Sequence, residues 1–171
     1  MIKLIKPTAR LKNDFLKMIE EYRAKSEFFV YHDIAMISFQ QYLDEMTDSE
    51  LGKDLKPGLV PQTTFWLVKE DAIILGESRL RHYLTPDLEL EGGHIGYAIR
   101  PSQRLYGFGT EILRLTLPEA GKLGLDRVLV TCDADNIGSS KIILANGGIF
   151  DGEGISKRSQ KIVHRYWVPV E

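Results

Sequence analysis

The chain has 171 residues, of which 43% are hydrophobic and 27% are charged, proportions that are typical of one folded globular domain. Its 22 basic and 24 acidic side chains give a formal charge of −2, which argues against a nucleic-acid-binding protein. Cys132 is the only cysteine, so neither a disulfide framework nor a multi-cysteine zinc site is expected. The four histidines lack metal-ligand spacing, and no apolar run resembles a signal peptide or a membrane span. We therefore expect a single cytoplasmic domain over residues 1–171 with no metal site.

The amino-terminal third is predicted to form one strand and two helices. Residues 2–5 are apolar and β-prone, and Thr8 can cap the helix that follows. One face of that helix carries its apolar residues, namely Leu11, Phe15, Met18 and Tyr22. A second helix is expected over residues 33–46, although its apolar residues do not settle on one stripe.

The rest of the chain is predicted to alternate between strands and helices. Residues 63–69 and 72–84 are typical of an antiparallel hairpin. Further strands are expected over 94–100, 127–132 and 162–170, and further helices from Thr110 and over 139–146. Pro118 should kink the helix from Thr110 or end it early. The order βααβββαβαββ predicts a mixed α/β fold.

A glycine-containing loop, Arg104 to Gly109, lies between a predicted strand and a predicted helix. Gly107 and Gly109 have no Cβ, so an anion can approach the main chain closely, and the helix presents free N–H groups at its positive end. A nucleotide-binding P-loop is excluded because no lysine follows Gly109. A dinucleotide-binding fingerprint fits two glycines but has Ile112 where the third should stand. The two glycines alone are equally compatible with a turn that binds nothing.

The loop resembles the acyl-CoA-binding motif of the GNAT acetyltransferases, Gln/Arg-x-x-Gly-x-Gly/Ala, here written Arg104-Leu105-Tyr106-Gly107-Phe108-Gly109. As in that family, it follows a strand and opens a long helix. A second resemblance is the pair Asn136 and Ser139 at the start of a later helix. The resemblance extends over the element order of nearly the whole chain. It implies acetyl-CoA as co-substrate and a GNAT fold, with a mixed central sheet of about six to seven strands flanked by about four helices.

The resemblance also implies a contact for each part of the cofactor. Main-chain amides from Arg104 to Thr110 would hold the pyrophosphate, and the Arg104 side chain would add a charge-assisted contact. Ile99 would pair with the pantetheine arm through its main chain, and Asn136 would bond to the pantetheine amides. Ser139 could contact the cofactor or cap its helix, and we favour the cap. The expected cofactor residues are Ala98, Ile99, Arg100, Arg104, Leu105, Tyr106, Gly107, Phe108, Gly109, Thr110, Asn136 and Ser139.

Transfer to an amine needs a base and a polarised thioester carbonyl. The candidates for the base, chosen by location, are Glu77, Glu89, Glu91 and His94. Glu77 could equally form a plain salt bridge with Arg79 or Arg81, and the face on which His94 lies cannot be assigned from the strand alternation. In the family the strand matching 94–100 carries a bulge with a free N–H that polarises the carbonyl, which makes Tyr97 to Ile99 candidates for that position.

The leaving thiolate needs a proton as well. Many family members use a tyrosine seven residues after the asparagine, and this sequence has Ile143 there. Tyr106 or solvent could take the role, or transfer could be weak or absent. Cys132 ends a strand near the expected cleft, but it lacks an evident histidine partner, so we interpret it as a buried core thiol.

The resemblance therefore predicts transfer of an acetyl group from acetyl-CoA to a primary amine of a small molecule or peptide, in a ternary complex. Residues 28–62 would supply the acceptor side. One alternative is an acyl-CoA-binding sensor without catalysis, which the isoleucine at 143 favours, and another is a dinucleotide-binding protein. Neither nucleic acid nor a membrane is an expected partner. The terminal strand, Arg165 to Val168, could pair across a homodimer.

Overall fold

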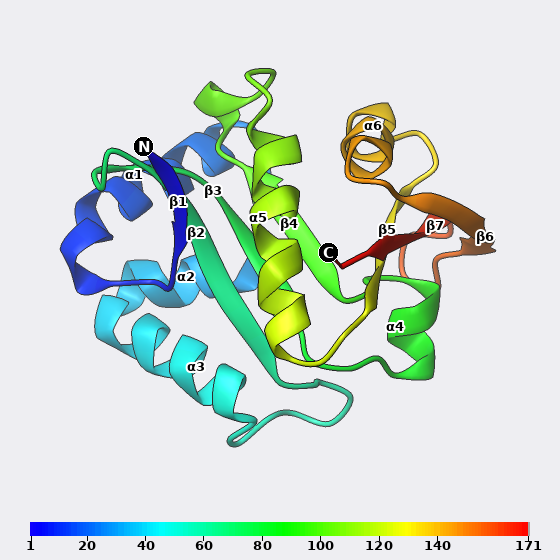
Figure 1. Ribbon diagram of the computed structural model, residues 1–171. Helices are drawn as coiled ribbons and strands as arrows, with labels where there is room; N and C mark the ends of the chain where they lie inside the picture. Colours follow the sequence, from blue (N-terminus) through cyan, green and yellow to red (C-terminus); the bar gives the residue numbers. More distant parts are fainter. Residues whose placement is uncertain (171) are drawn as a thin grey trace.

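The computed structural model describes residues 1–170 and has an α/β architecture (Figure 1). Within these residues there are seven strands and six α-helices, with short 3₁₀ turns at Ala9–Leu11 and Pro101–Gln103. The strands are β1 (Ile2–Ile5), β2 (Gln62–Lys69), β3 (Ile73–Arg81), β4 (Ile95–Ile99), β5 (Arg127–Asp133), β6 (Ile149–Ile155) and β7 (Ile162–Pro169). The helices are α1 (Lys12–Ala24), α2 (Val30–Ile37), α3 (Phe39–Leu51), α4 (Pro86–Leu90), α5 (Phe108–Lys122) and α6 (Ile137–Ala145). The expected α/β class and strand number are confirmed.

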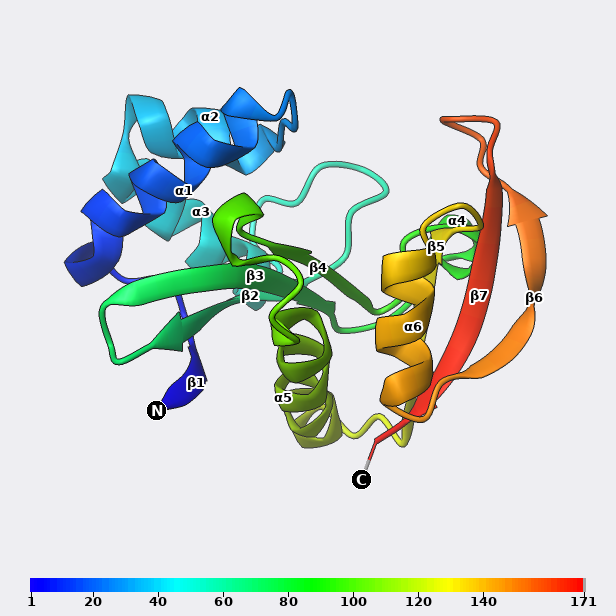
Figure 2. The ribbon, with the colours of Figure 1, turned by 90° about the horizontal axis from the view of Figure 1, so that it is seen from above.

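The first sheet has the order β1-β2-β3-β4, and all neighbouring strands in it are antiparallel. Helices α1, α2 and α3 cover one face of this sheet and α5 covers the other (Figure 2). Side chains alternate between the two faces along each strand. Trp66 accordingly packs with the amino-terminal helices, whereas its neighbour Leu67 packs with Ile112 of α5. The sheet is therefore buried on both faces.

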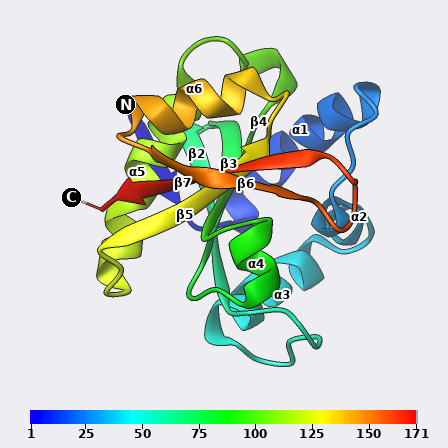
Figure 3. The same ribbon diagram turned by 90° about the vertical axis from the view of Figure 1, so that its right-hand side faces the viewer.

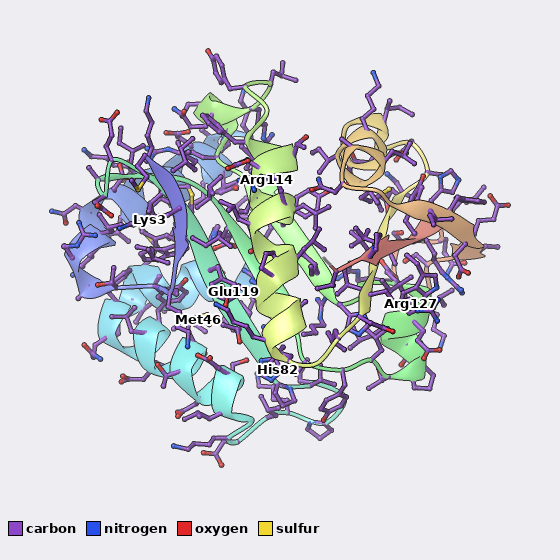
Figure 4. All side chains as sticks on the ribbon, in the orientation of Figure 1. Lys3, Met46, His82, Arg114, Glu119 and Arg127 are labelled. Atoms are coloured by element: carbon purple, nitrogen blue, oxygen red, sulfur yellow. The ribbon has the colours of Figure 1, made fainter. Side chains whose placement is uncertain are left out.

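The packing of α1 follows its sequence pattern. The Thr8 hydroxyl accepts a hydrogen bond from the Arg10 N–H at 3.4 Å and starts the 3₁₀ turn that leads into the helix. The predicted apolar face is buried, comprising Leu11, Phe15, Met18 and Tyr22. Phe15 stacks on Trp66 with 4.6 Å between ring centroids. Met46 of α3 is buried in the same core (Figure 4), so three helices share one core of aromatic and aliphatic side chains.

The second sheet has the order β5-β7-β6, with β7 between its two partners (Figure 3). The expectation that the terminal strand pairs across a homodimer is therefore wrong, because both sides of β7 are already hydrogen-bonded. The seven strands of residues 1–170 are thus divided between two antiparallel sheets of four and three strands, where the sequence predicts one mixed central sheet.

The two sheets meet where β4 begins. The His94 N–H donates to the Leu129 carbonyl at 2.7 Å, and the Leu129 N–H donates in return to His94 Nδ1 at 2.9 Å. Beyond this junction β4 has no strand pairing with β5 among the described residues. The separation leaves space beside β4, which the amino-terminal ends of α5 and α6 border.

Some details of the helices differ from the prediction. The helix expected over 33–46 is two helices, because Ser38 adopts an extended conformation and its side chain caps α3. Helix α4 was not predicted, although Thr85 caps it and Pro86 occupies its first turn. Pro118 does not end α5, which continues to Lys122. No helix within residues 1–170 is long and apolar enough to cross a membrane.

Candidate active site

A cleft of about 580 Å³ opens beside β4, a size that suits a cofactor or substrate. It is bordered by β4, by the loop before α5, by the first turns of α5 and α6, and by the loop between α1 and α2. The lining residues are Glu27, Tyr97, Ala98, Ile99, Arg104, Leu105, Gly107, Gly109, Thr110, Asn136, Gly138, Ser139 and Ile142. Most of the residues expected to contact a cofactor line this cleft. Arg100, Tyr106 and Phe108 do not have side chains among the lining.

The amino-terminal end of α5 supplies an anion-binding floor. Its first helical hydrogen bond runs from the Glu111 N–H to the Gly107 carbonyl at 3.1 Å, and Gly107 provides no side-chain cap. The N–H groups of Phe108 to Thr110 therefore lack a partner within the helix. They lie at the positive end of the helix dipole. This arrangement can bind a phosphate group through main-chain amides.

The two glycines of the loop serve different purposes. Gly107 has a φ angle of 82°, in the left-handed region that residues with a Cβ adopt only with strain. Gly109 has no such angle, but a Cβ on it would collide with the Ile142 side chain of α6. Gly109 therefore permits the close packing of α5 on α6.

Helix α6 forms the opposite wall, and Asn136 caps it. The Asn136 side chain accepts a hydrogen bond from the Ser139 N–H at 3.0 Å. The expectation that Ser139 itself caps the helix is therefore wrong. The Ser139 hydroxyl instead lies 2.8 Å from the Tyr97 hydroxyl. This hydrogen bond links α6 to β4 and so connects the two walls of the cleft.

Arg104 lies in the cleft with its guanidinium already engaged. Two of its nitrogens bond to the Glu27 carboxylate at 2.8 and 2.6 Å, and Nε donates to the Ile99 carbonyl at 3.0 Å. The hydrogen bond to Glu27, opposed in part by burial, raises the pKa of Arg104 above its ordinary value. A charge contact from Arg104 to a pyrophosphate would therefore compete with Glu27, which also lines the cleft.

Comparison with known families agrees with this geometry. The family described as "Acetyltransferase (GNAT) domain" matches residues 9–149, which is most of the chain. The chain belongs to the GNAT acetyltransferase family.

Solved acetyltransferases share its fold at low sequence identity. The microcin C7 self-immunity acetyltransferase MccE, solved with acetyl-CoA and AMP, is 15% identical, with a TM-score of 0.70 over 99% of this chain and 92% of that one. An acetyltransferase from Salmonella typhimurium that modifies the N-terminal serine of ribosomal protein L7/L12 is 11% identical, with a TM-score of 0.69 over 99% and 95% of the two chains. The ribosomal L7/L12 α-N-protein acetyltransferase RimL, solved with CoA, is 12% identical, with a TM-score of 0.68 over 99% and 94%. No curated protein matches the sequence.

The main chain of β4 in this acetyltransferase borders the cleft without a bulge. The pairing of β4 with β3 is continuous in register, so the bulge expected among Tyr97 to Ile99 is not present in it. The Arg100 N–H donates to the Leu75 carbonyl at 2.9 Å. Because bonding directions alternate along an antiparallel strand, Tyr97 and Ile99 direct their main-chain groups away from β3. The Ile99 carbonyl accordingly accepts a hydrogen bond from Arg104 in the cleft.

Arg100 turns away from the cleft, although the sequence predicts it to contact the cofactor. Its side chain is 9% exposed and forms ion pairs with Asp14 at 3.0 Å and Glu21 at 2.7 Å, both on α1. It also donates to the Ile74 carbonyl at 3.3 Å. Arg100 therefore fastens α1 to the sheet.

None of the four candidate bases lines the cleft, and Glu77 lines a smaller cavity beside it. His94 is at the junction of the sheets, where burial, with a smaller contribution from Arg81, lowers the pKa of His94 to about 4. Its Nδ1 is occupied by the Leu129 N–H. Glu89 is exposed on α4, and Glu91 accepts a hydrogen bond from the Ser156 hydroxyl.

Glu77 is the remaining candidate, and it is 3% exposed on the helix-covered face of β3. Its Oε1 accepts a hydrogen bond from Arg79 at 2.8 Å and lies 3.6 Å from His32 Nε2. Its Oε2 is buried and has no partner among the described residues. Burial alone would raise the pKa of Glu77, but the positive charge of Arg79 and the neighbouring His32 outweigh it and hold the pKa below its ordinary value.

Ile143 and Cys132 belong to a core that both sheets share with α5. Ile143 is fully buried, so the position that carries tyrosine in many family members does not face the cleft here. Cys132 is a buried free thiol, and burial raises the pKa of Cys132, which confirms its interpretation as a core residue. Tyr106 is 72% exposed and does not line the cleft.

Three residues of the cleft were not predicted. Gly138 and Ile142 line it from α6, and Ile142 follows Ser139 at the helical spacing that places residues on one face. That spacing could have identified Ile142. Glu27 reaches the cleft from the loop between α1 and α2, and no local pattern in the sequence points to it.

Proposed function

We propose that this GNAT protein transfers an acetyl group from acetyl-CoA to a primary amine within a ternary complex. The observation that supports this most directly is the cleft of about 580 Å³ in which unpartnered N–H groups of α5 face the free main-chain edge of β4. An acyl-CoA needs these two features, an anion site for its pyrophosphate and a polar strand edge for its amide-containing arm. The residues present therefore fit the co-substrate.

Each part of the co-substrate has a proposed partner. The N–H groups of Phe108 to Thr110 would hold the pyrophosphate, and Gly107 would let it approach the main chain. The Ile99 main chain and the Asn136 side chain would hold the pantetheine arm. Bound acetyl-CoA supplies a thioester whose acetyl carbon the amine nitrogen attacks. The new carbon–nitrogen bond replaces the carbon–sulfur bond, and the sulfur leaves with the electron pair of the bond that breaks.

The main chain of β4 is the proposed source of carbonyl polarisation. The N–H groups of Tyr97 and Ile99 are directed toward the cleft by the strand register. A fixed N–H dipole stabilises charge that develops on a carbonyl oxygen without having to reorient during the reaction. No bulge is needed for this, because the separation of β4 from β5 already frees these donors.

The Tyr97 hydroxyl is the proposed proton donor to the leaving sulfur. It lines the cleft and is held at 2.8 Å by the Ser139 hydroxyl. Burial, partly offset by that hydrogen bond, raises the pKa of Tyr97 to about 12, so the phenol keeps its proton at neutral pH. As the sulfur takes the electron pair, Tyr97 would give it a proton and be reprotonated by solvent. Tyr97 would then serve in place of the tyrosine that position 143 lacks.

Glu77 is the proposed acceptor of the proton that the amine loses. Its Oε2 is buried and unpartnered beside Tyr97 and Ala98, where it can accept a hydrogen bond from a neutral amine that has left its first proton to solvent. Its lowered pKa makes it a weak base toward a free ammonium ion. The amine nitrogen becomes far more acidic once it bonds to the acetyl carbon, so a carboxylate of low pKa can then take the proton.

Turnover with an amine panel tests this proposal. Purified protein would be incubated with acetyl-CoA and each amine, with thiol release and the mass of the acetylated amine as readouts. The proposal predicts amine-dependent thiol release and a matching acetylated product. Binding of acetyl-CoA without turnover of any amine would favour the acyl-CoA-binding sensor.

A further inference from the structure

A second cavity opens on the other side of β4, and we propose that it makes this protein an acetyltransferase for amines that carry a carboxylate. In this inference Arg79 and Arg81 bind the carboxylate of the acceptor, while Glu77 receives its amino group. The inference rests on the proposed function, because it identifies the class of acceptor for the same reaction.

The cavity has a volume of about 180 Å³ and adjoins the proposed acyl-CoA site. Its lining comprises Phe29, Glu77, Arg79, Arg81, Gly96, Tyr97 and Ala98. Tyr97 and Ala98 line both this cavity and the larger cleft. The two spaces therefore meet across the same stretch of β4, where the proposed acetyl group would lie. A small amine in the second cavity is placed to attack from the side opposite the cofactor.

Strand alternation brings the charged residues to this cavity. Glu77, Arg79 and Arg81 are two residues apart on β3, so all three lie on one face of the sheet. The residue opposite Arg79 on β4 is Gly96. A Cβ on Gly96 would meet no atom within 4 Å. The missing side chain at Gly96 therefore leaves open the space in front of the two arginines.

The charges in the cavity do not balance. Arg79 is paired with Glu77 at 2.8 Å, but within residues 1–170 no carboxylate lies at ion-pair distance from Arg81. Arg81 instead donates to the carbonyls of Gly92 and Gly93 at 2.9 and 3.0 Å. Burial, together with the positive charge of Arg79, lowers the pKa of Arg81. One guanidinium charge is therefore left without a counter-ion in a partly buried place, which is costly unless an anion binds there.

The count of charges favours a carboxylate over a phosphate. One uncompensated arginine matches an anion with a single negative charge, and the planar fork of a guanidinium matches the two oxygens of a carboxylate. The Arg79 Nε is also buried and lacks a partner, so a further donor is free for the same anion. The Arg79 guanidinium lies over the ring of Tyr31 of α2, with 4.9 Å between Cζ and the ring centroid. This cation–π contact holds the arginine in position.

The two ends of the cavity thus suit the two ends of one molecule. The unpartnered Glu77 Oε2 suits the N–H of an amine, and the arginines suit a carboxylate. A neighbouring cavity of about 210 Å³ shares Arg79 and Arg81 and continues past Tyr31 and Gln62. The substituent of an amino acid can extend into it. Amino acids and peptides with a short spacing between amine and carboxylate are therefore the expected acceptors.

Matched acceptors test this inference by turnover. Rates would be compared for phenylalanine, for its amide, for phenethylamine, which lacks the carboxylate, and for phosphoethanolamine as an amine that carries a phosphate. We expect phenylalanine to exceed its amide and phenethylamine by about ten-fold or more in kcat/KM, as for a lost charge-assisted contact. Arg81→Gln should abolish that preference and leave acetyl-CoA affinity unchanged. Equal rates with and without the carboxylate would overturn the inference, and so would a preference for phosphoethanolamine.

Two further variants separate a folding defect from a loss of recognition. Gly96→Val adds bulk to the cavity at an extended position where a β-branched residue is favoured, and it should lower turnover without lowering stability. Arg114→Gln removes an arginine from the outer side of α5 (Figure 4) and should change neither turnover nor acceptor preference. If Gly96→Val keeps full activity with phenylalanine, the cavity does not bind the acceptor.

A binding measurement keeps the inference testable if acetyl-CoA proves not to be the co-substrate. N-acetylphenylalanine and N-acetylphenethylamine would be titrated into the protein alone and followed by calorimetry. The inference predicts that only N-acetylphenylalanine binds measurably, and that Arg81→Gln lowers its affinity by about ten-fold. Equal binding of both compounds overturns the carboxylate site, whereas an absence of acetyl-CoA binding overturns only the proposed function.

Discussion

Replacing Arg100 by glutamine separates two roles that the sequence alone does not distinguish. The side chain is 9% exposed and is bonded to Asp14 and Glu21. Removing one member of a buried ion pair costs about 3–5 kcal/mol. The two carboxylates are 21% and 28% exposed, and each keeps one main-chain donor, Ile74 N–H for Asp14 and Ser102 N–H for Glu21. Water and these donors offset part of the loss, so we expect the free energy of unfolding to fall by about 2–3 kcal/mol.

Urea unfolding and acetyl-CoA calorimetry on the same samples would measure the two roles. A loss of this size should lower the melting temperature by about 4–12 °C for a chain of this length. In a double-mutant cycle, Asp14→Asn should recover part of the loss caused by Arg100→Gln, because it removes a carboxylate left without its partner. Affinity for acetyl-CoA should stay within about two-fold of wild type. A variant of full stability that no longer binds acetyl-CoA would refute this reasoning and assign Arg100 to the cofactor.

Three other predictions concern groups in or near the cleft. His94, whose pKa is lowered to about 4, resists protonation in the folded state while the unfolded chain takes up a proton near pH 6.5. Its contribution to the free energy of unfolding is therefore present above pH 6.5 and is lost as the pH falls toward 4, by about 2 kcal/mol between pH 7 and 5. In urea unfolding, the free energy of unfolding of His94→Gln should depend less steeply on pH than that of the wild type. An equally steep pH dependence in the two proteins would contradict this. Tyr97→Phe should lower kcat by about ten-fold or more with little change in KM for acetyl-CoA, and unchanged kcat would exclude Tyr97 as the acid. Asn136→Ala should lower the free energy of unfolding by about 1 kcal/mol, because the helix cap is lost, and should weaken the binding of acetyl-CoA. Asn136→Asp should restore the stability but not the affinity for acetyl-CoA.

The sequence predicts those parts of the fold that depend on local pattern. The apolar face of α1 follows from helical spacing, and the hairpin of β2 and β3 follows from β-branched and aromatic runs. Gly107 and Gly109 locate the start of α5 because local backbone geometry needs them there. Asn136 and Ser139 also fall at the start of a helix as expected. Motif and periodicity were therefore sufficient to locate the cleft.

Features that depend on contacts between distant elements could not be predicted in this way. The engagement of Arg104 by Glu27 joins residues far apart in the chain, and the outward turn of Arg100 depends on carboxylates of α1. The position of β7 between β5 and β6 is likewise a matter of sheet order, which strand propensity does not specify. His94 was an ambiguous candidate because alternation gives the two faces of a strand without saying which one a neighbouring sheet covers.

Acetyl-CoA calorimetry on Gly138 variants tests the central claim most directly. Gly138 lines the cleft near the start of α6, and a Cβ on it would meet only the Asn136 side chain, at 3.7 Å. Gly138→Glu should be tolerated by the fold, because an acidic residue suits the first turn of a helix, but its bulk and charge would oppose a bound pyrophosphate. We predict micromolar binding by the wild type and by Gly138→Ala, and none by Gly138→Glu. No heat from the wild type, or equal affinity in all three proteins, would contradict the assignment of this cleft to acetyl-CoA.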